Sequence, residues 1–292
     1  MTAIVFYLSK TNGAVSVNPS MFKGFDFKSI DQVVLESKKG RVDLKFNGTK
    51  WKVNNQFDAD QSMVEVLFAT LQQAEPKRPL AADIQDSVSA MLKQQGVKIS
   101  VVSAGQPALT FYAGGNAQKT QAYFATIGDD PKSYLVTIPG YRVYASGIFE
   151  VPEKDWKNKY VFGFNWRNFQ RLEAEFPDQR ANNFEVEPND SYFSVAGLVS
   201  IDTAKLNTFL DDVSLLTVDT YLDQASEDSI SQSSPIMLLK VKDIGQRVYT
   251  LELFWPNSSD AAIPGLINGI QWALFHPAKI RSIQKSKSFF EK

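Results

Sequence analysis

The chain has 292 residues, of which 43% are hydrophobic and 22% charged, values typical of a globular protein of about two domains. Its 31 Lys and Arg residues nearly balance its 32 Asp and Glu residues, so it lacks the concentrated positive charge of a nucleic-acid-binding protein. It has no cysteine and one histidine, His276, which excludes disulfides, a thiol nucleophile and multi-histidine metal sites. We therefore expect no metal, no cofactor and no nucleic-acid partner.

The N-terminus begins with a short apolar run over residues 3–8, followed by polar residues. A run of this length cannot cross a bilayer, which takes about 20 residues. A basic region and a small-residue cleavage site are also missing, so the run is not a complete signal peptide. Two interpretations stay open: a first strand or disordered start, or the outer end of a membrane anchor. We assign residues 1–25 as the remnant of an anchor or leader.

Three strands linked by tight turns are predicted next, over 30–35, 42–46 and 51–53. Apolar and polar residues alternate within each of them, as on a half-buried sheet. Asn47-Gly48 is a strong hairpin signal between the second and third strands. Asp60 is a suitable N-cap for an amphipathic helix over 61–72, where apolar residues recur at helical spacing.

A second group of strands follows Gly96, over 97–101, 109–111 and 134–136. Gly105-Gln106 forms the predicted turn between the first two of these strands. A short helix is expected at Ile148-Phe149.

The second half of the chain repeats this plan. Turns, helix caps and apolar faces recur at a nearly constant distance, which is unlikely to arise by chance. Corresponding landmarks, separated by 139 to 142 residues, are Ile30 and Phe169, Val53 and Val195, Asp60 and Asp202, Gly105 and Gly245, and Phe149 and Phe290.

The repeat predicts two tandem units, over 26–155 and 156–292. Each unit is expected to be a mainly antiparallel β-sheet with one or two packed helices, because hairpin-linked strands dominate the pattern. The predicted fold class is therefore α+β.

Three short motifs contain residue types that occur in catalytic or ligand-binding sites. Gly114-Gly115-Asn116 follows a strand, but the P-loop pattern is missing, so a plain loop is favoured. Asp129-Asp130 resembles a turn, and Asp211-Asp212 lies on the polar side of a predicted helix. Acid–base chemistry or metal binding would need several such acids to converge on one pocket. We predict no catalytic residues.

A dense aromatic segment lies between the two halves, over residues 156–166. One interpretation is that it joins the halves as packed core. The other is a groove or partner surface, where Trp and Tyr are favoured anchors. The candidate ligand or partner residues are Trp156, Tyr160, Phe162 and Trp166.

The first half also resembles a known family. The segments that carry this resemblance are SIDQVVLESKKGRVDLKFNGTKWKVN at 29–54, the capped helix at 60–72, GVKISVV at 96–102, FYAGG at 111–115, YLVTIPG at 134–140 and EKDWKNK at 153–159. Together they resemble the bacterial domain-of-unknown-function family numbered 4340, in the form common in Bacteroidetes. The resemblance covers residues 26–225, and the remainder more weakly.

The resemblance implies a membrane-anchored, extracytoplasmic protein on the periplasmic side of the inner membrane. Related domains occur in auxiliary components of ABC exporters, including those linked to gliding motility, so it also implies transporter subunits as partners. We expect a non-catalytic accessory component of the cell envelope. The alternative is a glycan- or lipid-binding module with an aromatic groove between the repeats. A hydrolase would require acids such as Asp129, Glu185 and Asp212 to cluster.

Overall fold

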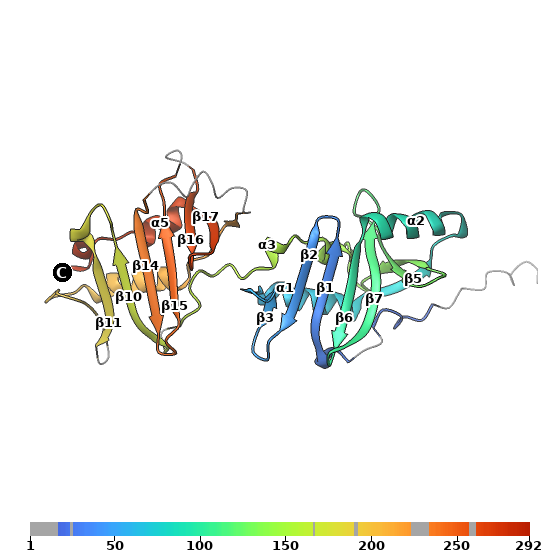
Figure 1. The fold of residues 1–292 in the computed structure, drawn as a ribbon, viewed down its shortest axis with the longest axis horizontal. Helices are drawn as coiled ribbons and strands as arrows, with labels where there is room; N and C mark the ends of the chain where they lie inside the picture. The colour runs from blue at the N-terminus through green and yellow to red at the C-terminus, as the bar shows by residue number, and fades with distance from the viewer. Residues whose placement is uncertain (1–16, 24–25, 166, 190–191, 223–233, 257–260) are drawn as a thin grey trace, which may run out of the picture. The chain divides into compact units, whose positions relative to one another are not determined.

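The fold was analysed in a computed structural model (Figure 1). The structure describes residues 17–23, 26–165, 167–189, 192–222, 234–256 and 261–292. The chain divides into two compact units, here called unit 1 (residues 1–158) and unit 2 (residues 159–292). Among the described helices, none combines the length and the apolar character that a membrane span requires.

Unit 1 is built on a nine-stranded antiparallel sheet with the order β4-β3-β2-β1-β6-β7-β8-β9-β5. Its strands are β1 (Ile30–Ser37), β2 (Gly40–Phe46), β3 (Trp51–Val53), β4 (Phe57–Asp58), β5 (Glu75–Pro79), β6 (Val97–Ser103), β7 (Gln106–Gly115), β8 (Ala122–Thr126) and β9 (Ser133–Thr137). Its helices are α1 (Gln61–Gln73), α2 (Ala82–Gln95), α3 (Glu153–Trp156) and the 3-10 turns η1 (Phe27–Ser29) and η2 (Gly147–Glu150).

The core of unit 1 lies between the sheet and α1, which crosses one face of the sheet (Figure 1). Leu35 on β1 pairs with Val42 on β2 and with Ile99 on β6, so the three side chains share the buried face. The helix adds Val64, Leu67 and Leu71 to this core. The Asp60 side chain accepts a hydrogen bond from the backbone N–H of Met63, which confirms the predicted cap.

Unit 2 is built on an eight-stranded antiparallel sheet with the order β12-β11-β10-β14-β15-β16-β17-β13. Its strands are β10 (Phe169–Glu175), β11 (Phe184–Asn189), β12 (Tyr192–Val195), β13 (Thr220–Tyr221), β14 (Met237–Asp243), β15 (Val248–Leu253), β16 (Ile263–Ile267) and β17 (Gln271–Phe275). Its helices are α4 (Thr203–Ser214), α5 (Pro277–Ile283) and the 3-10 turns η3 (Arg180–Asn182) and η5 (Lys287–Phe290).

The two sheets share one topology. When the order of the unit 1 sheet is followed from β3 to β5 and that of the unit 2 sheet from β12 to β13, each strand has a counterpart in the same place. Even a bulge recurs, because the pairing of β1 with β6 shifts between Ile30 and Gln32 and that of β10 with β14 shifts between Phe169 and Arg171. The α+β class and the tandem arrangement are therefore confirmed.

One predicted correspondence, between Phe149 and Phe290, differs in the structure. The backbone N–H of Asp60 donates to the carbonyl of Trp156 at 2.8 Å, and that of Asp202 donates to the carbonyl of Phe290 at 2.9 Å. Both aromatic side chains are 0% exposed. Trp156 is thus the counterpart of Phe290. The constant offset fails here because unit 1 has a longer segment between its last hairpin strand and this closing aromatic residue.

The boundaries of the units also differ from the expected ones. Trp156 belongs to the core of unit 1, and the division falls between Asn158 and Lys159 rather than at 155–156. Upstream, the Phe22 ring packs against those of Phe111 and Phe124, with centroids 5.3 Å apart in each pair. Unit 1 therefore includes residues that precede position 26. Residues 1–16, which carry the apolar run, lie outside the described residues.

Candidate functional site

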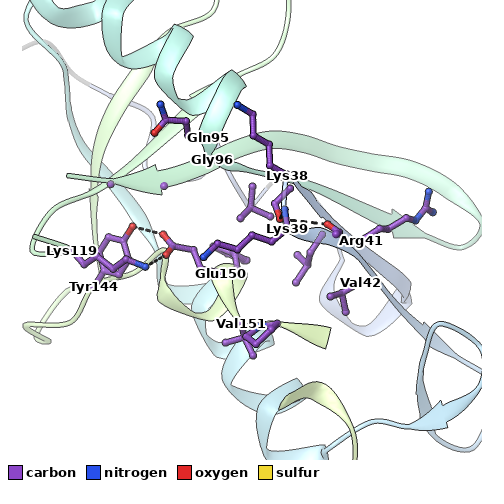
Figure 2. A pocket seen from close by; sticks show the side chains of 18 of the residues that line it. Lys38, Lys39, Arg41, Val42, Gln95, Gly96, Lys119, Tyr144, Glu150 and Val151 are labelled. Atoms are coloured by element: carbon purple, nitrogen blue, oxygen red, sulfur yellow. Dashed lines mark hydrogen bonds and ion pairs between the residues drawn. The ribbon is translucent and has the colours of Figure 1, made fainter. Parts of the chain in front are cut away.

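A cavity of about 490 Å³ lies at one end of the unit 1 sheet and is here called the unit 1 pocket (Figure 2). It forms where β1 and β7 end and where β2 and β6 begin. The last turn of α2 and the segment around η2 also line it. Four stretches far apart in the sequence meet there: 35–42, 91–97, 114–119 and 144–153. Its position is set by the sheet order, because β1 lies between β2 and β6.

The floor of the pocket is formed by hydrophobic core side chains at this end of the unit 1 sheet. Leu35 and Phe149 are each 2% exposed, and Val42 and Val97 are also buried. Val151 adds a half-buried apolar side chain at the edge. The deep part of the pocket therefore offers apolar contact.

The rim of the pocket is rich in cations. Lys38 and Lys39 form the turn of the β1–β2 hairpin, and Arg41 follows at the start of β2. Figure 2 shows Lys39 extending from the hairpin across the pocket toward Glu150, whereas the Arg41 side chain points away. Arg41 is paired instead with Glu36 at 3.3 Å, on the neighbouring strand.

The opposite wall holds a coupled group of Tyr144, Glu150 and Lys119. The Tyr144 hydroxyl donates to Glu150 Oε1 at 2.5 Å, and Lys119 Nζ pairs with Glu150 Oε2 (Figure 2). Burial and the bond to Glu150 raise the pKa of Tyr144 above its ordinary value, so the phenol keeps its proton. The wall is thus a closed network, in which the carboxylate of Glu150 is already neutralised.

Two glycines allow this wall to form. A Cβ atom on Gly115 would clash with the Tyr144 ring and with the Gln121 carbonyl oxygen. A Cβ atom on Gly114 would lie 2.7 Å from the Leu92 side chain. The glycines at the end of β7 therefore leave room for Tyr144 on one side of the strand and for Leu92 of α2 on the other.

The corresponding end of unit 2 carries large side chains. In unit 1, Leu35 on β1 pairs with Val42 and Ile99 on the two neighbouring strands. In unit 2, Ala174 on β10 pairs with Phe184 and Leu239 in the same way. Phe184 is therefore the counterpart of Val42. By the same register, Phe176 replaces Ser37 and Phe254 replaces Gly114.

These three phenylalanines are buried. The Phe184 ring packs against Phe209 and Phe290, with centroids 5.5 Å and 5.0 Å apart, and Phe254 packs against Trp272 at 5.0 Å. A depression of about 430 Å³ does lie against β10 and β11, but its Arg171 is paired with Glu173 and Glu185. Among the residues that the structure describes, the apolar, cation-rimmed pocket lies in unit 1.

The predicted aromatic site is divided between the two units. Trp156 is buried in unit 1, where its indole N–H donates to the carbonyl of Val151 at 3.2 Å. Phe162 is buried in the core of unit 2, whereas Tyr160 is 52% exposed. Trp166 lies outside the described residues. Trp156 and Phe162 thus belong to the cores of different units, and the role of the segment as a ligand or partner surface stays a prediction.

Sequence reasoning missed the unit 1 pocket, although it considered one part of it. The sequence predicts a plain loop at Gly114-Gly115-Asn116, whereas the two glycines end β7 and line the pocket. Asn116 organises the turn that follows, since its side-chain oxygen accepts from the backbone N–H groups of Thr120 and Gln121. The signal that was available is the contrast with Phe254 and its neighbour in the second half of the chain.

The acids considered for catalysis belong to separate places. Asp129 lies in the β8–β9 connection of unit 1, whereas Glu185 and Asp212 lie on β11 and α4 of unit 2. Within the described residues, no group of three or more His, Cys, Asp or Glu side chains is arranged to hold a metal ion.

Comparison with family models gives one match. Residues 51–235, more than half of the chain, match the family described as Domain of unknown function (DUF4340). The chain belongs to this family. The matched region begins at β3 of unit 1 and ends before β14 of unit 2, so the DUF4340 match spans parts of both units. Neither the curated proteins nor the solved structures give a match.

Proposed function

We propose that this DUF4340 protein is a non-catalytic component of the cell envelope that holds a ligand in the unit 1 pocket. One observation carries the proposal: within the described residues the pocket lies in unit 1, and at three of the positions that correspond to its lining unit 2 has buried phenylalanines. Its volume of about 490 Å³ falls within the range of small-molecule sites, roughly 300–1,000 Å³.

The ionisable residues near the pocket support binding rather than catalysis. Glu150 is occupied by Tyr144 and Lys119, and Glu153 is paired with Lys157 at 3.3 Å. The chain's one histidine, His276, has a structural role in unit 2, because its Nδ1 accepts from the backbone N–H of Ala278 at the start of α5.

We further propose that the protein works outside the cytoplasm beside an ABC-type transporter, with the transporter's membrane subunits as its partners. Support comes from the segments that resemble the form of the family common in Bacteroidetes, since related domains occur in auxiliary components of ABC exporters. The near-balance of 31 basic and 32 acidic residues supports a partner other than nucleic acid. A glycan- or lipid-binding role stays compatible with this setting, with the unit 1 pocket in place of a groove between the repeats.

Native mass spectrometry of the full chain, isolated from its own cells, tests the pocket. We expect a bound small molecule on the wild type that is lost in Ser37→Phe, which copies Phe176 of unit 2 into the rim. Ser87→Phe is the matched control, because Ser87 is exposed on α2 and outside the pocket. The proposal is wrong if the wild type carries no ligand, or if both variants retain it equally.

Cross-linking in native cells tests the setting. The tagged protein is cross-linked and purified, and its partners are identified by mass spectrometry. We expect transporter permease and ATPase subunits to be enriched over an unrelated anchored control. A preparation without any enriched membrane partner contradicts the setting and leaves the pocket to be judged by the first experiment.

A further inference from the structure

We infer that the ligand of the unit 1 pocket is an amphiphile with an acyl chain and an anionic headgroup, either a carboxylate or a phosphate. The inference rests on the proposed function and specifies the ligand class. It follows from the division of the pocket into an apolar floor and a cationic rim, and from the state of the hydrogen-bonding groups between them.

The floor favours an apolar body over a polyhydroxylated one. Its side chains, such as Leu35, Val97 and Phe149, have no hydrogen-bonding groups. Two polar backbone groups next to it are already paired: the Gly96 N–H donates to the Leu92 carbonyl oxygen at 2.9 Å, and the Gly114 carbonyl accepts from Ser146 Oγ at 2.6 Å. A sugar hydroxyl placed there would lose its water without gaining a partner, which costs about 1–3 kcal/mol per group.

The rim favours an anion. Lys38 and Lys39 are exposed, and neither ammonium group forms an ion pair with any residue that the structure describes. The other charged groups around the pocket are paired with each other or with neighbours, as Lys119 is with Glu150 and Glu153 with Lys157. Two uncompensated positive charges therefore face a ligand whose apolar part lies on the core.

The two lysines are held in place by the hairpin. The backbone N–H of Lys39 donates to the Ser37 hydroxyl at 3.1 Å, and Gly40 has a φ of +134°, which side-chain-bearing residues rarely adopt. In unit 2 the equivalent connection instead contains η3 (Arg180–Asn182). The short, ordered turn fixes the backbone of both lysines at the rim, so less rotational freedom of the backbone is lost on binding.

Calorimetric titration of the full chain tests the headgroup with four probes of equal chain length, all below their micelle concentrations. Dodecanoate and dodecyl phosphate are expected to bind, and dodecanol and dodecyltrimethylammonium to bind at least about tenfold more weakly, because they lack the charge-assisted contact. Dodecanoate and dodecyl phosphate together distinguish a fatty acid from a phospholipid-like headgroup as the source of the anion. Acetate and inorganic phosphate, which lack the chain, are expected to show no heat of binding.

Charge reversal locates the headgroup. Lys38→Glu combined with Lys39→Glu is expected to weaken dodecanoate at least about tenfold. Lys28→Glu combined with Lys77→Glu makes the same change in net charge at exposed positions outside the pocket and is expected to leave the affinity unchanged. Ser37→Phe is expected to abolish binding of every probe.

The outcomes separate the inference from the proposed function. If dodecanol binds as tightly as dodecanoate and charge reversal has no effect, while Ser37→Phe still blocks binding, the headgroup assignment is wrong and the pocket stands. If no amphiphile binds, or if a peptide or sugar is the molecule retained on the native protein, the ligand class is overturned. Loss of the retained molecule in Ser37→Phe would then still support the proposed function.

Discussion

The two units show how one topology yields two different surfaces. Their strands have the same order and even the same bulge in the central pair. Yet one end of the sheet is a pocket in unit 1, whereas the described residues at three equivalent positions of unit 2 are buried phenylalanines. Residues that pair across the sheet centre stay apolar in both, as Leu44 and Val186 do. At three paired positions the difference is a replacement of Ser, Val or Gly in unit 1 by Phe in unit 2.

This contrast teaches that the fold and the site are specified by partly different residues, since Leu35 and Val42 belong both to the core and to the pocket floor. The sheet depends on the alternating core positions, whereas the pocket depends on what is small at the strand ends. Changes at the shared positions should affect both units alike, and changes at the strand ends should affect them differently.

The largest effect is expected at the shared closing aromatic residues. Trp156→Ala in unit 1 and Phe290→Ala in unit 2 should each lower the free energy of unfolding of their own unit by about 3–5 kcal/mol, because each removes a fully buried ring. Denaturant titration of the full chain, with hydrogen exchange to assign each transition to a unit, measures this. A loss below about 1 kcal/mol in either would break the correspondence between Trp156 and Phe290.

A smaller, one-sided effect is expected at Gly115. Gly115→Ala should destabilise unit 1 by about 1–3 kcal/mol, because the added Cβ atom meets the Tyr144 ring and the Gln121 carbonyl oxygen. The residue at the equivalent position of unit 2 is Trp255, which is 65% exposed, so Trp255→Ala should change stability by no more than about 0.5 kcal/mol. Equal effects of the two variants, measured by the same titration, would contradict the claim that the strand ends are packed differently in the two units.

The helix caps should give a smaller and symmetrical effect. Asp60 and Asp202 each accept a hydrogen bond from the backbone N–H three residues later. Replacement of either by Ala should cost about 1 kcal/mol, and replacement by Asn should cost less, since Asn also caps helices. If Ala at one position has no effect on the thermal unfolding of its unit, that cap does not stabilise the helix. The two caps would then share their geometry but not their contribution to stability.

The smallest effect is a change with pH. Because burial and Glu150 raise the pKa of Tyr144, the folded state holds this proton more tightly than the unfolded state, whose tyrosines titrate near pH 10. The contribution is complete below about pH 10 and is lost as the pH rises further.

Tyr144→Phe should therefore flatten the alkaline fall in unit 1 stability, by less than about 1 kcal/mol for this partly exposed group. In unit 2, burial raises the pKa of Tyr221 to about 12, so unit 2 should keep its own alkaline fall in the Tyr144 variant. Denaturant titrations at pH 8, 9.5 and 11 measure both slopes. An unchanged slope in unit 1 would show that Tyr144 does not titrate as described.

Local signals predicted much of the fold. The turn at Asn47-Gly48 and the caps at Asp60 and Asp202 are determined by neighbouring residues, so they could be recognised without the tertiary structure. The repeat then made the antiparallel α+β architecture predictable, because both halves supplied the same order of turns and apolar faces.

The end of each repeat and the pocket were not predictable in the same way. A constant offset makes Phe149 the counterpart of Phe290, but unit 1 has more residues than unit 2 between its last hairpin strand and the closing ring. The equivalent hydrogen bonds from Asp60 and Asp202 instead make Trp156 the counterpart of Phe290. The pocket depends on strand register, which brings Lys39, Gly115 and Glu150 together from distant parts of the chain. No local pattern contains that register.

The most direct test of the central claim is the amide spectrum of the full chain during titration with dodecanoate. The account predicts shifts at the unit 1 pocket, in residues 37–42, 95–97 and 114–119, and none at the equivalent positions of unit 2, in residues 174–176, 184 and 253–255. Shifts of equal size in both units, or none at the unit 1 pocket, would contradict it.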